Sequence, residues 1–312
     1  MSTTLAKVFF FSYLCIHIGQ GKTYRSFCLN KTMIGVFDSG YGGLTILKQI
    51  RKLLPEYNYI YLGDNARAPY GTRSFECIYR YTLEAVDFLQ AQGCRLIILA
   101  CNTASAKALR TIQQHDINPD NVRVLGVIRP TVEVVPLLSK TRHVGVLATQ
   151  GTVASDSYRI ELEKMVEKSN DAETLTVTQQ ACPMWVPLIE SGEHNTEGAE
   201  FFIHKYVKQL IARDPLIDTI LLGCTHYPLI QSRIDAVLNE FAGQTGHSYQ
   251  TVAQGGIVAQ SLKDYLARHP EIELHIQKGG ECSYLTTDDA EKFAQAATLF
   301  LGSPVSAKHV EY

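Results

Sequence analysis

Short aliphatic and β-branched runs alternate with longer helical stretches along this chain from Met33 onward. Residues 95–99 form an almost wholly apolar run, which is typical of a strand buried on both faces of a parallel sheet. Further runs of this kind occur at residues 34–37, 59–62, 144–147 and 219–222. Leu44, Leu47 and Ile50 follow the first run at helical spacing. The alternation predicts an α/β fold with mainly parallel sheets.

Composition and charge favour a small-molecule partner. The chain has 312 residues, enough for two modest domains, and its formal net charge of -2 comes without a Lys/Arg run that would attract nucleic acid or a membrane surface. Eight cysteines are too few for a disulfide scaffold and include no C-x-x-C pair, which argues against a zinc site. Reduced thiols indicate a cytoplasmic protein, and we interpret Cys77, Cys94 and Cys282 as small buried hydrophobes.

The first 32 residues differ from the rest of the chain. Residues 8–16 form an apolar run after Lys7, similar to the core of a signal peptide but shorter than the roughly 20 residues that span a bilayer. No clear small-x-small cleavage site follows this run. We expect Met33 to be the native start, and residues 1–32 to be an extension that is disordered or not native.

Two segments of the chain share one plan. Residues 96–103 and 219–226 each contain an apolar strand, one small residue, a cysteine, and polar residues that open a helix. Cys101 and Cys224 occupy the equivalent positions, although chance similarity between two buried strands is an alternative. The echo suggests two related halves that face each other, each delivering a cysteine from the carboxyl end of a strand, where ligands bind in open α/β sheets.

A cysteine at the start of a helix lies beside free N–H groups and the positive end of the helix dipole. Both lower the pKa of a thiol from about 8.5 and favour the thiolate, and the same N–H groups bind carboxylates. We expect this environment at Cys101 and Cys224. Two such thiols on opposite sides of a carbon acid fit inversion, because a thiolate removes the α-proton and the opposite thiol returns one to the other face.

Asp38 and Ser39 end the first strand and precede a glycine-rich turn at residues 40–43. The glycines allow a tight turn and close backbone approach, and Asp38 could hold an ammonium group or orient a thiol. A dinucleotide fingerprint with Asp64 as the ribose-binding acid is the alternative. It fits poorly, because the third glycine is missing and Asp38 would repel a pyrophosphate.

The other candidate polar residues each have a plain structural alternative. Tyr70-Gly71 has the composition of an ordinary turn. Thr149 and Thr152 could bind a carboxylate or simply cap a helix. His226 could exchange a proton with the cysteine two residues before it, although a lone histidine is more often structural. Glu190 is expected to be exposed to solvent.

Together these motifs resemble the glutamate racemase family, from Met33 to about residue 300. The matching motifs are Gly35-Val36-Phe37-Asp38-Ser39-Gly40 with Gly42-Gly43-Leu44, Gly63-Asp64, Pro69-Tyr70-Gly71, Ala100-Cys101-Asn102-Thr103-Ala104-Ser105, Gly126-Val127-Ile128, Ala181-Cys182-Pro183 and Gly223-Cys224-Thr225-His226-Tyr227-Pro228. Each motif alone is short, whereas the ordered set is specific.

The resemblance implies two pseudo-symmetric α/β domains with the active site in the cleft between them. One domain would comprise residues 33–126 plus 238–312, and the other residues 127–237. The implied activity is interconversion of L- and D-glutamate, without pyridoxal phosphate, metal or any other cofactor. Such an enzyme supplies D-glutamate for peptidoglycan synthesis, and so for cell-wall biogenesis and cell shape, and a homodimer is expected.

The resemblance also assigns roles residue by residue. Cys101 and Cys224 would be the acid/base pair, with Cys224 deprotonating the L-isomer. Asp38, His226 and Glu190 would assist the thiols. The residues that would hold the substrate are Asp38, Ser39, Tyr70, Gly71, Asn102, Thr103, Thr149, Thr152, Thr225 and His226.

The chain departs from the family pattern at a few positions. Arg129 stands where an acidic residue is expected, Thr131 replaces a small residue, and residues 254–256 replace a more acidic turn. Aspartate racemisation on the same fold is the nearest alternative activity. A cysteine hydrolase or transferase with His226 as base would leave the second echoed cysteine without a function. A non-catalytic amino-acid binding protein of this fold is disfavoured because both cysteines are present.

Overall fold

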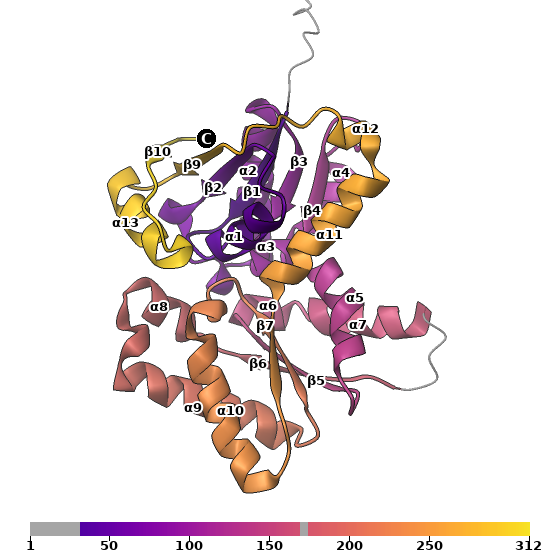
Figure 1. The fold of residues 1–312 in the computed structure, drawn as a ribbon, viewed down its shortest axis with the longest axis vertical. Helices are drawn as coiled ribbons and strands as arrows, with labels where there is room; N and C mark the ends of the chain where they lie inside the picture. The colour runs from indigo at the N-terminus through magenta and orange to yellow at the C-terminus, as the bar shows by residue number, and fades with distance from the viewer. Residues whose placement is uncertain (1–31, 169–173) are drawn as a thin grey trace, which may run out of the picture. The chain divides into compact units, whose positions relative to one another are not determined.

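The computed structural model describes residues 32–168 and 174–312 (Figure 1). The extension expected at residues 1–32 therefore lies outside the described residues, apart from its last one. Two parallel sheets, each with helices on both faces, make up the described chain.

The larger sheet has six strands in the order β10-β9-β2-β1-β3-β4, and all neighbouring pairs are parallel. Its strands are β1 (Met33–Asp38), β2 (Tyr59–Gly63), β3 (Cys94–Leu99), β4 (Arg123–Gly126), β9 (Cys282–Thr286) and β10 (Ala307–His309). Phe37 of β1 pairs with Leu62 of β2 and with Leu99 of β3. Because the three strands end together, the loops that carry Ser39 and Cys101 begin at the same edge of the sheet.

The smaller sheet has four parallel strands in the order β6-β5-β7-β8. They are β5 (His143–Ala148), β6 (Thr176–Ala181), β7 (Thr219–Gly223) and β8 (Gln250–Ala253). Ala148 of β5 pairs with Gly223 of β7, so Thr149 and Cys224 follow adjacent strands at one edge. In both sheets, the echoed cysteine comes just after an inner strand.

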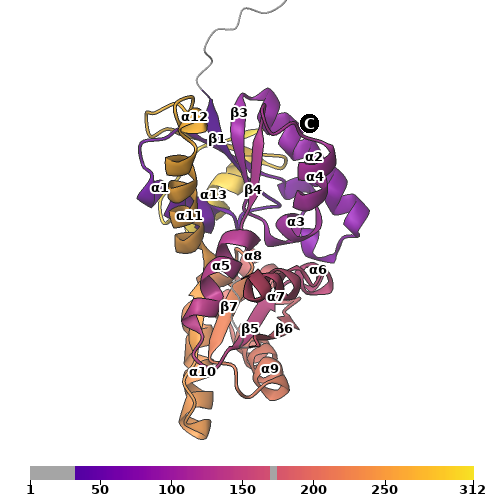
Figure 2. The ribbon, with the colours of Figure 1, turned by 90° about the vertical axis from the view of Figure 1, so that its right-hand side faces the viewer.

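Helices cover each sheet on two sides. On the larger sheet, α1 (Leu44–Leu53), α11 (Gln254–Arg268) and α13 (Ala290–Leu301) pack on one face, and α2 (Phe75–Ala91) and α4 (Leu109–His115) on the other (Figure 2). On the smaller sheet, α9 (Glu197–Arg213) and α10 (Gln231–Thr245) face α5 (Ile128–Leu138) and α7 (Ser157–Lys168) across the strands. The short helices are α3 (Asn102–Lys107), α6 (Gln150–Ala154), α8 (Trp185–Glu190) and α12 (Pro270–Glu273), with 3₁₀ turns η1 (Asn65–Arg67), η2 (Tyr70–Thr72), η3 (Glu193–Asn195) and η4 (Tyr227–Ile230).

The alternation of side chains along each strand produces these layers. Ile34 and Val36 of β1 contribute to the core under α1, whereas Phe37 contributes to the core under α2. Both faces of the strand are thus buried, which explains why its sequence is apolar from Met33 to Phe37. Leu47 and Ile50 of α1 are fully buried against the first of these cores, as their helical spacing predicts.

The predicted α/β class with mainly parallel sheets is confirmed. The division into two domains stays a prediction, but sheet membership bears on one boundary. Strand β8 belongs to the smaller sheet, so the chain leaves that sheet after Ala253, later than the crossing predicted at residue 238. Among the described residues, no helix combines the length and the apolar character that a bilayer span requires.

Candidate active site

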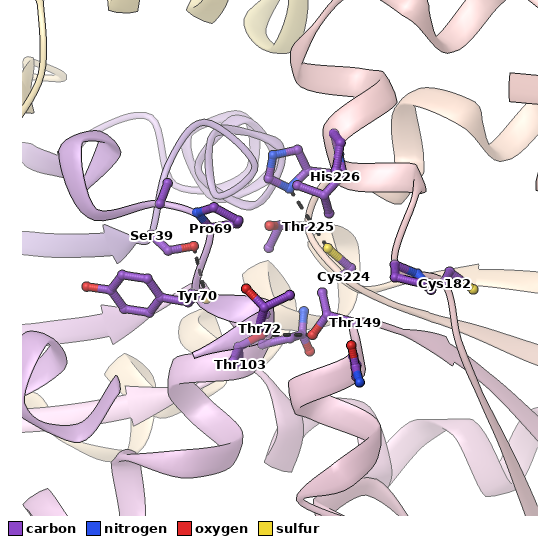
Figure 3. Close-up of a pocket in the computed structure, with 18 of the residues that line it drawn as sticks. Ser39, Pro69, Tyr70, Thr72, Thr103, Thr149, Cys182, Cys224, Thr225 and His226 are labelled. Carbon is purple, nitrogen blue, oxygen red and sulfur yellow. Dashed lines mark hydrogen bonds between the residues drawn. The ribbon is translucent and has the colours of Figure 1, made fainter. Parts of the chain in front are cut away.

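A pocket lies where the loops after the strands of the two sheets meet (Figure 3). In Figure 3, Ser39 and Tyr70 lie on one side of it, and Cys182 and Cys224 lie on the other. The residues that line the pocket are Ser39, Ala68, Pro69, Tyr70, Gly71, Thr72, Cys101, Asn102, Thr103, Thr149, Gln150, Cys182, Pro183, Val186, Pro187, Glu190, Cys224, Thr225 and His226. All follow the carboxyl ends of parallel strands, which is the usual ligand position in α/β folds.

Cys101 lies between the end of β3 and the start of α3 and is only 6% exposed. Its thiol donates a hydrogen bond to the Ser39 hydroxyl, with Sγ 3.4 Å from Oγ. Burial and the negative charge of Asp38 raise the pKa of Cys101 to about 12, although Ser39 and the N–H of Ala104 act in the opposite direction. The expected lowering is therefore wrong at this position, because desolvation of the thiolate outweighs the helix start. Cys101 is a thiol at neutral pH.

Cys224 has a different set of neighbours. Its Sγ lies 3.9 Å from Nδ1 of His226, and Nε2 of the same imidazole lies 2.9 Å from Oε1 of Glu190. Burial alone lowers the pKa of His226, but its bonds to Cys224 and Glu190 raise that pKa to about 10. The imidazole is therefore cationic at neutral pH, between a sulfur atom and a carboxylate. Glu190 ends helix α8 and is an exposed residue, as the sequence predicted, but its carboxylate is not free: it is paired with His226, and its side chain is 25% exposed.

The glycine-rich turn after β1 packs closely against the loop that follows β7. A Cβ atom on Gly42 would lie 2.3 Å from Oγ1 of Thr225 and 2.4 Å from Nδ1 of His226. Asp38 sits beneath the turn, accepting hydrogen bonds from the N–H of Gly40 at 3.0 Å and from Oγ1 of Thr225 at 3.4 Å. The close approach that these glycines permit is thus to residues 225 and 226, not to the phosphates of a dinucleotide.

Three threonine hydroxyls form a cluster at one end of the pocket. Oγ1 of Thr103 lies 3.0 Å from Oγ1 of Thr149 and 3.3 Å from that of Thr152, and the last two are 3.0 Å apart. Thr149 also caps helix α6, because its side chain accepts from the N–H of Thr152. The capping role and a place in the pocket wall are therefore compatible.

A buried carboxylate fixes the wall formed by Tyr70. Asp64 is fully buried and accepts hydrogen bonds from the Tyr70 hydroxyl, from Nε of Arg67 at 2.7 Å and from Oγ1 of Thr287 at 2.9 Å. Because both carboxylate oxygens already accept hydrogen bonds and the residue is fully buried, Asp64 is not available to bind a ribose hydroxyl. The Tyr70 hydroxyl is committed to this network, so its ring and backbone are the parts that face the pocket.

The structure brings most predicted site residues together around one pocket. All of them line the pocket except Asp38 and Thr152, which are buried behind Thr225 and Thr149. Sequence reasoning left Cys182 out of the site, although the motif at residues 181–183 gave a signal. Burial raises the pKa of the Cys182 thiol well above its usual range, so it stays a neutral thiol.

The remaining wall residues define what the pocket can do chemically. Within residues 32–168 and 174–312, no group of three or more His, Cys, Asp and Glu side chains could hold a metal ion. The pocket instead combines the sulfur atoms of Cys101, Cys182 and Cys224 with one imidazolium and a group of hydroxyls. These groups suit proton transfer to and from a small polar molecule with an anionic group.

The chain belongs to the Asp/Glu/hydantoin racemase family, whose model matches residues 43–243. The glutamate racemase of Paracoccus denitrificans is 39% identical over 282 residues, covering 87% of this chain and 97% of the relative. That of Cereibacter sphaeroides is 40% identical over 278 residues, covering 86% and 96%. Among solved structures, glutamate racemase from Francisella tularensis in complex with D-glutamate is similar, with a TM-score of 0.77 at 30% identity over 90% of this chain and 98% of that chain.

Proposed function

We propose that this protein is a glutamate racemase that interconverts L- and D-glutamate by moving the α-proton between Cys101 and Cys224. The observation that carries the proposal is the position of the two thiols. Each follows an inner strand of a different sheet, and both line one pocket. The names of the relatives, and their similarity over nearly the whole of their length, support glutamate as the substrate.

The surroundings of the two cysteines differ, which suits one of them to act first as the base and the other as the acid. The His226 imidazolium lies 3.9 Å from the sulfur of Cys224, where a cation favours the negative charge that a base must carry, whereas Cys101 is held as a thiol. The Cys224 thiolate takes the α-proton, leaving a carbanion whose charge spreads into the α-carboxylate, and the Cys101 thiol gives its proton to the opposite face. Cys224 ends as a thiol and Cys101 as a thiolate, so the reverse turnover restores the starting state. We assign the L-isomer to Cys224 on the family resemblance.

Hydroxyl groups supply the binding contacts in this proposal. Thr103 and Thr149 present hydroxyls at one end of the pocket, and Ser39, which accepts from Cys101, presents its O–H near the thiols. Such donors stabilise a carboxylate, whose charge increases as the α-proton leaves. Asp38 and Thr152 act from behind the wall by holding Thr225 and Thr149.

Incubation with L-glutamate in deuterated water, without added cofactor, tests the function. D-glutamate should form and carry deuterium at the α-carbon, because the proton returned by Cys101 comes from solvent. L-aspartate under the same conditions should give much slower exchange. Folded protein that causes neither exchange nor a change in optical rotation would refute the racemase proposal.

The remaining cellular assignments rest on the resemblance. We propose that the enzyme acts without a cofactor, as a homodimer in the cytoplasm, and supplies D-glutamate for peptidoglycan synthesis. Light scattering on the purified protein should give twice the monomer mass. A chain that stays monomeric at working concentrations would contradict the dimer and leave the reaction unaffected.

A further inference from the structure

Three buried side chains next to Cys101 form a closed ring of hydrogen bonds. Nδ2 of Asn102 donates to Oε1 of Gln254 at 2.7 Å, and Nε2 of Gln254 donates to the Tyr158 hydroxyl at 2.7 Å. The Tyr158 hydroxyl donates back to Oδ1 of Asn102, which closes the ring. Each group in this Asn102 ring is donor to one neighbour and acceptor from the other.

The ring joins parts of the fold that the chain brings from far apart. Asn102 is the first residue of α3 and directly follows Cys101. Tyr158 lies on α7, which packs on the smaller sheet. Gln254 begins α11, at the point where the chain leaves β8 of the smaller sheet for a helix that packs against α1 on the larger one. The ring therefore connects the segment that carries one thiol to the elements of the other sheet.

The same glutamine also reaches the second connection between the sheets. Its Nε2 lies 3.0 Å from Oγ1 of Thr131 and 3.4 Å from the carbonyl oxygen of Val127, in the segment from β4 into α5. Thr131 in turn donates to the Val127 carbonyl at 2.7 Å. Gln254 and Thr131 are two of the departures from the family pattern, and the structure shows that they contact each other.

Burial makes the ring costly to break. Asn102 and Gln254 are each 2% exposed, and Tyr158 and Thr131 are fully buried. A buried polar group that loses its partner pays its desolvation cost without compensation, so these side chains hold one arrangement. The Asn102 amide is consequently fixed in orientation, together with the start of α3 and the adjoining thiol.

We propose that Gln254 and Tyr158 are positioning residues for the Cys101 side of the reaction, acting through Asn102. The inference rests on the proposed function for its kinetic readout, but the structural link that it describes does not. Neither residue lines the pocket, so neither touches the reacting atoms. Loss of their polar groups should misplace the Cys101 thiol. The Tyr158 ring lies beside Gly223, which precedes Cys224, so the test keeps this ring and removes only the hydroxyl.

The test compares Tyr158→Phe and Gln254→Leu with controls away from the pocket. Tyr59→Phe removes an equally buried hydroxyl, which donates to the Leu54 carbonyl, and Gln231→Leu removes an amide that donates to Thr251. Each ring variant should lower kcat by about tenfold or more with a smaller change in KM, since small misplacements of a reacting group are expensive. The two controls should retain the wild-type kcat.

Isotope effects separate positioning from simple loss of folded protein. The isotope effect is the ratio of kcat/KM for ordinary glutamate to that for glutamate with deuterium at the α-carbon. If proton transfer to Cys101 becomes the slow step in a ring variant, this ratio should exceed the wild-type ratio for the enantiomer that gives its proton to Cys101. For the other enantiomer the ratio should be smaller than in the wild type. A smaller folded fraction would lower both rates and leave both isotope effects unchanged. Unchanged isotope effects in both ring variants would overturn the proposal.

A second measurement does not depend on racemase activity. Iodoacetamide should alkylate Cys101 several times faster in Tyr158→Phe than in the wild-type protein, because the start of α3 is less firmly held, whereas Cys77 on α2 should react at the same rate in both. If the wild-type protein proves unable to racemise glutamate, the proposed function fails. The alkylation rates then still test whether Tyr158 and Gln254 hold the segment that carries Cys101. Equal Cys101 alkylation in wild type and both ring variants would overturn that link.

Discussion

The imidazole of His226 binds the carboxylate of Glu190, with Nε2 2.9 Å from Oε1, on the side opposite the Cys224 sulfur. This contact and the one to Cys224 together overcome the effect of burial and raise the pKa of His226 to about 10. The edge of the His226 ring also packs against Phe300 of α13, with ring centroids 5.6 Å apart. His226 is therefore fixed in both charge and orientation.

Replacement of Glu190 by glutamine should narrow the active pH range. The neutral amide no longer stabilises the imidazolium, so the pKa of His226 falls from about 10 and the alkaline limb of the kcat/KM profile moves to lower pH. Profiles of wild type and Glu190→Gln measured on the same buffers check this. Glu193→Gln, an exposed neighbour, serves as the control, and an unshifted limb in Glu190→Gln would contradict the pairing.

Protein stability should depend on pH through the same histidine. The pKa of His226 is about 10 in the folded protein and about 6.5 in the unfolded chain, so the imidazole binds its proton more tightly in the folded state. The resulting stabilisation is complete below about pH 6.5 and is lost as the pH rises towards 10. Urea unfolding of wild type and His226→Asn should show a difference in unfolding free energy that shrinks over this window. A difference independent of pH would contradict the assignment.

A single methyl group on Gly42 should damage the site. The added Cβ would meet Thr225 and His226 at 2.3 and 2.4 Å, so the His226 ring must move relative to Cys224. We expect Gly42→Ala to lower kcat by about 100-fold while the protein remains folded, as judged by circular dichroism. Wild-type turnover in this variant would show that the turn can yield without disturbing His226.

Gly256 offers a matched substitution without a clash. It lies within α11, and a Cβ there has no heavy atom within 4 Å. Gly256→Ala should therefore leave kcat unchanged and raise the unfolding free energy by about 0.5–1 kcal/mol, because alanine is the better helix residue. If Gly256→Ala also lost activity, the loss in Gly42→Ala could not be attributed to the clash with Thr225 and His226.

Much of the site could be predicted from the sequence because the end of each apolar run marks the end of a strand. The apolar runs before Cys101 and Cys224 identify parallel strands, and the carboxyl ends of such strands share an edge. The residues that follow them, such as Ser39 and Thr149, are therefore brought together by topology alone. The matching order of residues in the two cysteine segments indicated that each half of the chain contributes one cysteine to the site.

Other features depend on contacts between distant segments and leave no local pattern. The raised pKa of Cys101 comes from burial and from Asp38, 63 positions earlier in the chain, so a helix start predicted the wrong direction. Glu190 pairs with His226 only because α8 folds back on the loop after β7. Gln254 and Tyr158 carried no motif, and Gln254 was noticeable only as a departure from the family pattern.

Removal of one hydroxyl from the threonine cluster should weaken substrate binding more than it slows turnover. Thr149→Val keeps the shape of the side chain but loses the contacts to Thr103 and Thr152, and it loses the helix cap as well. We expect KM for L-glutamate to rise by about tenfold with a smaller fall in kcat. Thr149→Ser, which retains the hydroxyl, should restore KM. If the serine variant behaves like valine, the hydroxyl is not the relevant group.

Serine at either cysteine should abolish most of the activity, because a hydroxyl is a far weaker acid than a thiol. The proposed reaction uses one thiol as base and the other as acid, so Cys101→Ser and Cys224→Ser should each reduce racemisation by about 10²–10⁴-fold in both directions. A hydrolase or transferase would require only one of them. Cys77→Ser, on the partly exposed side of α2, should keep the wild-type rate. If either pocket variant racemised glutamate at a near-native rate, the two-thiol mechanism would be refuted.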